Sequence, residues 1–194
     1  MAKNIPSNNK DRIYSSKQAE VKDFSFNDQV ADVFPDMIAR SVPGYKNIID
    51  GIGKLSAIFA KDNTHIYDLG CSLGAASLSM AKHVQNNGVK IIGVDNSAAM
   101  VSRCQRNVDN YKYHSTIHII KDDIARIALK PASVIVMNFT LQFIEKTKRD
   151  ALMSKIYDAL VPSGVLILSE KIKLGHPQID SAIIDCHHEF KREN

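Results

Sequence analysis

Two short apolar segments each end at an acidic residue and a turn. The first, His65–Leu69, contains Asp68 and runs into Gly70-Cys71-Ser72-Leu73-Gly74. The second, Ile91–Val94, is followed by Asp95. Both have the length and composition of buried parallel strands, and a parallel α/β sheet binds ligands beyond the carboxyl ends of its strands. The acids and glycines are therefore expected to face one site, which has the character of a nucleoside site.

The spacing of the two glycines bears on the kind of nucleoside. In the dinucleotide fingerprint G-x-G-x-x-G, the middle glycine lets a pyrophosphate approach the backbone, and here Ser72 occupies that position. This disfavours a pyrophosphate. S-adenosyl-L-methionine (AdoMet) carries no phosphate, and its cationic groups and ribose hydroxyls suit Asp68 and Asp95. Taken alone, Gly70 and Gly74 are better explained by the tight turn that any doubly wound protein needs.

Composition limits the classes of protein. With 194 residues, 44% hydrophobic and 24% charged, the chain has the core of one globular domain. Its amino terminus lacks the apolar centre of a signal peptide and no apolar run approaches a membrane span, so a cytoplasmic location is expected. Three cysteines without C-x-x-C spacing indicate neither a disulfide framework nor a metal site. The net charge of +4 comes from scattered basic residues, which does not indicate nucleic-acid binding.

Hydrophobic periodicity divides the chain into a mobile polar arm (1–23), an N-terminal helical cover (24–64) and an α/β domain (65–194). The predicted helices cover 30–38, with Pro35 as a weak point, 48–59, 76–83, 97–108 with Ser97 as N-cap, 147–160 opened by a capping pair of Thr147 and Asp150, and 178–191. The predicted strands cover 66–69, 90–94, 117–121, 134–139 and 165–169. This alternation predicts an α/β protein with a parallel sheet in the order 3-2-1-4-5.

The next two strands also end in polar groups. The third ends in Asp122-Asp123-Ile124 and the fourth in Asn138. A carboxylate at Asp123 can accept from an adenine amino group while the following backbone N–H, that of Ile124, donates to a ring nitrogen. Taken alone, Asp123 is better explained as a solvated loop acid. The series of four strand ends favours the nucleoside site.

Further segments give the chain a family resemblance. The stretches Arg40-Ser41-Val42-Pro43-Gly44-Tyr45 and Asn138-Phe139-Thr140-Leu141-Gln142-Phe143 are the most specific, and residues 33–38, 67–76, 168–171 and 187–192 accompany them. Together they resemble the carboxy-S-adenosyl-L-methionine synthase family, within the Rossmann-like class I AdoMet-dependent methyltransferases. The resemblance spans about residues 24–194.

The resemblance implies an enzyme that converts AdoMet and prephenate to carboxy-AdoMet and phenylpyruvate. Its product supplies the donor for 5-oxyacetyluridine at the tRNA wobble position, and the enzyme is expected to be a homodimer without direct contact to nucleic acid. The residues carried over to the cofactor are Tyr45, Gly70, Cys71, Ser72, Asp95, Asn96, Asp123, Ile124 and Asn138. The ring of Tyr45 can cover a sulfonium by cation–π attraction, or simply cap a proline-glycine turn.

The chain also departs from the family. Family members continue past Asn194 with two further strands, a helix and an arginine that holds the new carboxylate. This chain therefore looks shortened at its carboxyl end, and we expect it to bind AdoMet but to be weakened or inactive in catalysis. No catalytic side chain is identified, because the resemblance makes the substrate the base, and no metal is expected. Two alternatives stay open: an AdoMet-dependent small-molecule methyltransferase, and an inactive AdoMet-binding module.

Overall fold

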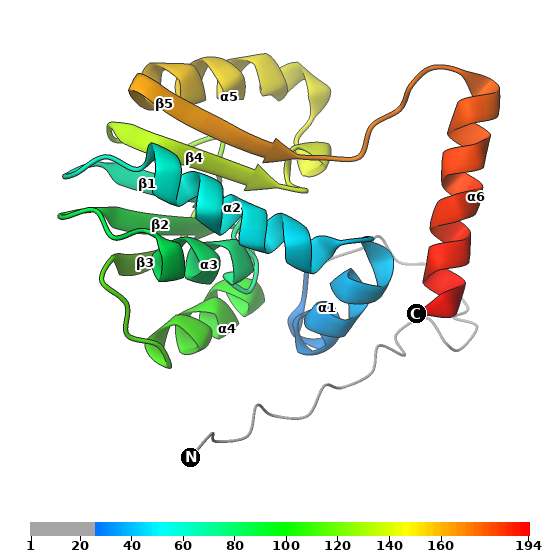
Figure 1. Ribbon diagram of the computed structural model, residues 1–194, viewed down its shortest axis with the longest axis horizontal. Coiled ribbons are helices and arrows are strands. Elements are labelled where there is room, and N and C mark those ends of the chain that lie inside the picture. Colours follow the sequence, from blue (N-terminus) through cyan, green and yellow to red (C-terminus); the bar gives the residue numbers. More distant parts are fainter. Residues whose placement is uncertain (1–25) are drawn as a thin grey trace. The chain divides into compact units, whose positions relative to one another are not determined.

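A five-stranded parallel sheet forms the centre of the computed structural model, which describes residues 26–194 (Figure 1). The strands, in the order β3-β2-β1-β4-β5, are β1 (His65–Leu69), β2 (Lys90–Asp95), β3 (Thr116–Lys121), β4 (Ala132–Asn138) and β5 (Leu160–Ser169). All four neighbouring pairs are parallel. The predicted strand order is therefore confirmed.

The described residues fall into two compact units. The larger unit runs from Asn47 to Ile172 and contains the sheet. The smaller combines the described residues up to Lys46 with Lys173–Asn194. The predicted polar arm lies outside the described residues, and the other predicted domain boundaries stay predictions.

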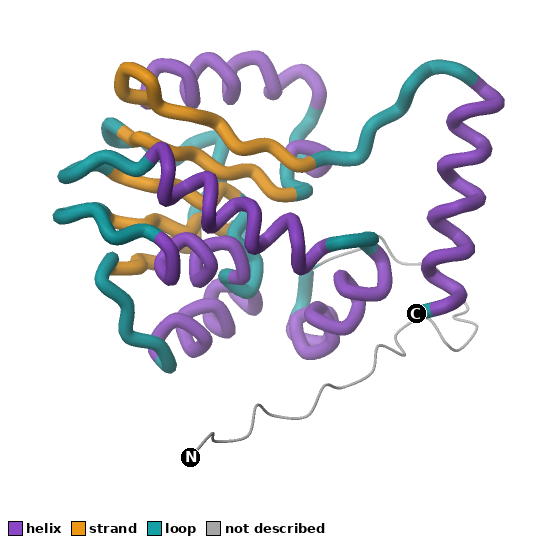
Figure 2. Tube along the Cα trace, viewed as in Figure 1, coloured by secondary structure: helices purple, strands orange, loops and turns teal. Residues whose placement is uncertain are grey.

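In the larger unit, helices cover both faces of the sheet (Figures 1 and 2). On one face, α2 (Tyr45–Phe59), which belongs to this unit from Asn47 onward, and α3 (Ala75–His83) pack a core built around Ile66, Met80 and Ile91. Helix α4 (Ala98–Asp109) adds Cys104 and Val108 against Ile117, which also touches that core. On the other face, α5 (Lys146–Ala159) packs Leu152 and Ile156 against alternate strand residues, including Tyr67, Leu69, Ile135 and Met137. Because side chains alternate along a strand, successive β1 residues serve opposite cores.

The smaller unit contains α1 (Asp28–Ser41) and α6 (Pro177–Glu193). Asn27 caps α1 through its side-chain oxygen, which accepts from the N–H of Val30 at 3.0 Å. Pro35 lies inside this helix without ending it. The ring nitrogen Nε2 of His187 in α6 lies 2.7 Å from the carbonyl oxygen of Ser41, which joins the two helices. His187 thus packs as a structural side chain within this unit.

The start and end of α5 differ from the sequence prediction. The helix begins at Lys146, with Glu145 at the N-cap position making no side-chain cap bond, so the predicted capping pair of Thr147 and Asp150 is wrong. It ends at Ala159, because Leu160 already pairs with Ala132 at the start of β5. A register shift between Ala132 and Val134 accommodates the proline-serine-glycine segment that follows Leu160, which a pattern of apolar residues cannot indicate.

Among residues 26–194, no helix combines the length and the apolar character needed to cross a membrane. The short 3-10 helix Leu141–Phe143 completes the described elements and follows β4 directly.

Ser97 caps α4 as predicted, since its hydroxyl oxygen accepts from the N–H of Met100 at 3.2 Å. We predict that Ser97→Ala lowers the free energy of unfolding by about 1 kcal/mol, because an N–H at the helix start loses its acceptor. Urea unfolding followed by circular dichroism measures this. Ser97→Thr should retain most of the stability. Ser102→Ala, an exposed change on the same helix, should cost less than about 0.5 kcal/mol, and an equal loss in both alanine variants would contradict the cap.

Candidate functional site

The turn after β1 is held in a conformation that few residues adopt. Gly70 has φ +82° and Gly74 has φ +84°, the left-handed region that favours glycine. The N–H groups of Gly70 and Cys71 both donate to the carbonyl oxygen of Val94, at 2.8 and 3.0 Å, which ties the turn to β2. A side chain at Gly70 would also overlap that of Thr140, which follows β4. The turn is thus packed between the ends of β2 and β4.

Asp95, the last residue of β2, holds this turn through its side chain. Its Oδ2 accepts from the N–H of Ser72 at 2.9 Å, and its Oδ1 accepts from the N–H of Ser97 at 2.9 Å. Burial raises the pKa of this carboxyl, while hydrogen bonds from the backbone of Ser97, Ser72 and Asn96 oppose the rise. Each carboxylate oxygen can accept more than one hydrogen bond, so Asp95 retains capacity for a pair of ribose hydroxyls.

Asp68 is the most buried acid near the turn, with 1% of its surface exposed. Its Oδ2 accepts from the hydroxyl of Ser77 in α3 at 2.6 Å. Burial raises the pKa of Asp68 to about 6, which the hydrogen bonds from Ser77 partly oppose. The carboxyl thus joins β1 to α3 beneath the turn, and a direct contact with a nucleoside stays a prediction. No sequence signal pointed to Ser77 as its partner.

Cys71 supplies packing within the turn. Its side chain is buried in a small cluster with Cys104 and Val108 of α4. A hydrogen bond with Cys104, followed by burial, raises the pKa of the Cys71 thiol well above its ordinary value. A thiol that resists ionisation is a poor nucleophile, so the structure gives Cys71 a packing role in the turn.

A helical turn follows β3 and carries the next two candidate residues. Oδ1 of Asp123 accepts from the N–H of Ala125 at 2.8 Å, and its carbonyl oxygen accepts from Arg126 and Ile127 at 2.8 and 3.0 Å. Its Oδ2 lies 3.8 Å from Nε of Arg126, and the side chain is 48% exposed. Ile124 is buried. The N–H of Asp122 donates to the carbonyl oxygen of Asp95 at 3.1 Å, so this turn is joined to the end of β2.

Asn138 ends β4 with an unsatisfied polar atom. Its side-chain oxygen is buried and lacks a hydrogen-bond partner among the described residues, a property it shares there only with the hydroxyl of Ser56 in α2. The next residue, Phe139, has φ +55°, an uncommon value for a side chain of this size. A buried acceptor without a donor is costly unless a ligand or water supplies one. Of the candidate residues, Asn138 therefore shows the clearest need for a ligand donor.

These residues come together because of the strand order. Residues 70–72, 95–96, 123–124 and 138 follow or end the four adjacent strands β1 to β4, all at the carboxyl edge of the sheet (Figure 1). Tyr45 belongs to the smaller unit, so its part in the site stays a prediction. Among the described residues, no group of three or more His, Cys, Asp or Glu side chains could hold a metal ion. The donors and acceptors at the edge fit a nucleoside with ribose hydroxyls and an amino-substituted base.

The raised pKa of Asp68 has a consequence for stability. Between about pH 4 and pH 6 the native state binds more protons at this carboxyl than the unfolded chain does, so its contribution to the free energy of unfolding falls as pH rises. We predict that Asp68→Asn removes this fall, which is on the order of 3 kcal/mol. Urea unfolding of both proteins across this pH range measures the difference.

Ser77→Ala is the matched variant, because it removes the hydrogen bond that lowers the Asp68 pKa and leaves the carboxyl in place. It should extend the fall in stability to higher pH. If wild type and Asp68→Asn give parallel curves of stability against pH, the raised pKa is wrong.

Comparison with known proteins agrees with this geometry. Residues 66–164 match the model of a family described as a methyltransferase domain. The carboxy-S-adenosyl-L-methionine synthase of Colwellia psychrerythraea is 55% identical over 184 residues, which is 95% of this chain and 75% of that protein. The enzyme of the same name from Vibrio cholerae is 51% identical over 187 residues, covering 96% of this chain and 76% of its own length.

A solved structure supports the fold independently. The crystal structure of a Methanococcus maripaludis protein, assigned to the S-adenosyl-L-methionine-dependent methyltransferases, aligns with a TM-score of 0.63. It is 22% identical and covers 92% of this chain and 76% of its own chain, a likeness of fold. Sheet order, strand-end site and sequence identity lead to one assignment: the chain belongs to the carboxy-S-adenosyl-L-methionine synthase family of AdoMet-dependent enzymes, built on the class I methyltransferase fold.

Proposed function

We propose that this protein binds AdoMet at the carboxyl edge of β1 to β4 and carboxylates it. In this arrangement Asp95 accepts hydrogen bonds from the ribose hydroxyls, since its oxygens already face the turn at Ser72. Asp123 and the N–H of Ile124 pair with the adenine edge. The side-chain oxygen of Asn138 accepts from a donor on the cofactor, which would satisfy the one buried acceptor that the candidate residues leave unpaired.

The proposed reaction takes AdoMet and prephenate to carboxy-AdoMet, phenylpyruvate and water. The carboxyl carbon that leaves prephenate forms a new carbon–carbon bond to the methyl carbon attached to sulfur. That methyl carbon gives up one proton and the prephenate ring gives up its hydroxyl group, which together form the water. No external oxidant or reductant is needed. The product would then serve as donor for 5-oxyacetyluridine at the tRNA wobble position, so no direct RNA contact is required of this chain.

One observation carries this reaction: 55% identity over 95% of the chain to an enzyme named carboxy-S-adenosyl-L-methionine synthase. An identity this high extends well beyond the glycine turn, which by itself marks only the superfamily. The geometry supports the nucleoside part of the proposal. The proposed homodimer and the use of prephenate rest on the family resemblance.

The side chains at the site are proposed to orient the cofactor and to exclude a competing nucleophile. Each carboxylate oxygen of Asp95 already accepts one hydrogen bond from a backbone N–H, so the orientation of this side chain is set before a ligand arrives. Cys71 is buried with a raised pKa, which removes the nearest thiol as a competing nucleophile. Tyr45 is proposed to cover the sulfonium by cation–π attraction. None of these groups acts as a base toward the methyl carbon, in keeping with a base supplied by the second substrate.

Asp95 provides the most direct test of the ribose contact. We predict that Asp95→Ala weakens AdoMet affinity by roughly 1 to 3 kcal/mol, because two ribose hydroxyls lose a charged acceptor. Asp95→Asn should lose less, since its amide oxygen still accepts one hydrogen bond. Isothermal titration calorimetry measures both, and thermal unfolding checks that the turn remains folded. Unchanged affinity in a folded Asp95→Ala protein would reject the assignment.

The reaction itself is tested by incubating the protein with AdoMet and prephenate, without tRNA or added metal, and analysing the products by mass spectrometry. The proposal predicts phenylpyruvate and a nucleoside heavier than AdoMet by one carbon dioxide. Prephenate with S-adenosylhomocysteine in place of AdoMet is the control, because that compound lacks the methyl carbon. Accumulation of S-adenosylhomocysteine would overturn the proposal in favour of a methyltransferase. AdoMet binding without any product, both from this chain and from one extended at its carboxyl end, would overturn it in favour of a binding module.

A further inference from the structure

A lysine on α5 contacts the turn that carries the proposed adenine contacts. The ammonium of Lys155 donates to the carbonyl oxygen of Ile124 at 2.6 Å and to that of Ile127 at 3.1 Å. Lys155 is half-buried and lies one residue before Ile156, whose side chain belongs to the core on this face of the sheet. The two accepting residues are 31 and 28 positions away in sequence. This contact therefore connects α5 to the end of β3.

The turn has opposite polarity at its two ends. At its start, the Asp123 carboxylate accepts from Ala125, and the N–H of Ile124 donates to no acceptor among the described residues. The carbonyl oxygens of Ile124 and Ile127 point instead toward α5, where the ammonium of Lys155 donates a hydrogen bond to each of them. A cation is favourable at the carbonyl end of a helical turn. The group that binds the carbonyl end thereby fixes the direction in which the N–H end points.

We propose that Lys155 is a positioning residue for base recognition: by holding the carbonyls of Ile124 and Ile127, it sets the orientation of the Asp123 carboxylate and the Ile124 N–H that read the adenine edge. This inference rests on the proposed adenine contact at Asp123. It assigns to α5 a share in the choice of base.

The charges around Lys155 favour an ammonium group held in one position. Burial lowers the pKa of Lys155, and the charges of Asp123 and Asp122 oppose this effect. Burial disfavours the charged ammonium, and its two carbonyl acceptors together with these acids stabilise it at this position. Apolar packing also joins the turn to α5, because Ile124 and Ile127 lie in one core with Leu152 and Ile156. A useful variant must therefore keep the packing and remove only the donors.

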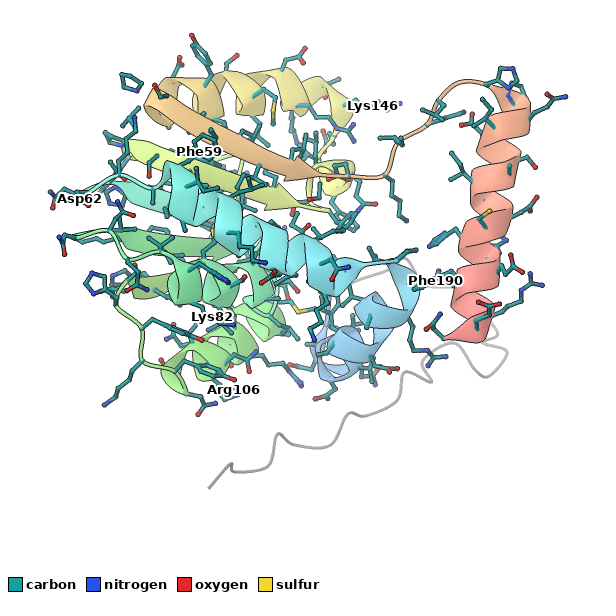
Figure 3. All side chains as sticks on the ribbon, viewed as in Figure 1. Phe59, Asp62, Lys82, Arg106, Lys146 and Phe190 are labelled. Carbon is teal, nitrogen blue, oxygen red and sulfur yellow. The ribbon has the colours of Figure 1, made fainter. Side chains whose placement is uncertain are left out.

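Lys155→Met meets that requirement, since it preserves an unbranched apolar stem and removes the ammonium. Its readout is the ratio of dissociation constants for S-inosylhomocysteine and S-adenosylhomocysteine, measured by calorimetry. Wild type should prefer the adenine compound, whose amino group Asp123 accepts. We expect this ratio to fall at least tenfold in Lys155→Met and to recover in part in Lys155→Arg, which restores a cation with several donors. Lys146→Met is the control: this exposed lysine begins the same helix (Figure 3) and should leave the ratio unchanged.

Asp123→Ala separates failure of this inference from failure of the proposed function. If Asp123→Ala keeps the full preference for adenine, the adenine contact itself is wrong. If Asp123→Ala loses the preference while a folded Lys155→Met keeps it, the adenine contact stands and Lys155 is only a stabilising residue. Should Lys155→Met fail to fold, Lys155→Leu applies the same ratio with another side chain that has no donor, and an unchanged ratio there overturns the inference.

Discussion

The carboxylate of Asp95 is the interaction on which the rest of the site depends. One side chain at the end of β2 accepts from the N–H of Ser72 in the glycine turn and from the N–H of Ser97 at the start of α4. These two segments come from different βα units. Because the hydrogen bonds are made before any ligand arrives, the backbone that faces a nucleoside is organised in advance. A preorganised site spends less of its binding free energy on ordering the protein.

Close packing adds a second constraint at the same edge. Gly70 has both a left-handed backbone and no room for a side chain, because Thr140 occupies the adjacent space. Thr140 follows Asn138, whose buried oxygen lacks a partner among the described residues. The glycine turn and the segment after β4 are thus fitted to each other. This mutual fit gives a physical reason for two separated stretches of the sequence to carry the family resemblance together.

Local patterns were sufficient to predict the sheet order, most elements and the strand-end residues. Apolar strands ending in Asp95 and Asn138 carry that information within a few positions. The start of α5 was missed because Thr147 and Asp150 resemble a capping pair that the helix does not use. The early start of β5 depends on pairing with Ala132, and the contact of Lys155 with Ile124 spans 31 positions. Such contacts arise from tertiary packing and leave no local signal.

Asp68 illustrates the same difference for a single residue. Its place at a strand end predicts a ligand contact, whereas its burial and its hydrogen bond to Ser77 give it a structural partner within the fold. Asp95 lies two positions further along β2 than Gly93, the residue that pairs with Asp68, and its side chain stays partly exposed. Strand register and the neighbouring helix therefore separate two acids that look alike in the sequence.

The most direct test of the account is a crystal structure of the protein with S-adenosylhomocysteine, which places the nucleoside without turnover. The account predicts both ribose hydroxyls within hydrogen-bond distance of the Asp95 carboxylate, with the hydrogen bonds to Ser72 and Ser97 retained, and the adenine edge against Asp123 and Ile124. A nucleoside bound away from the carboxyl ends of β1 to β4, or one whose ribose leaves Asp95 without a contact, would contradict it.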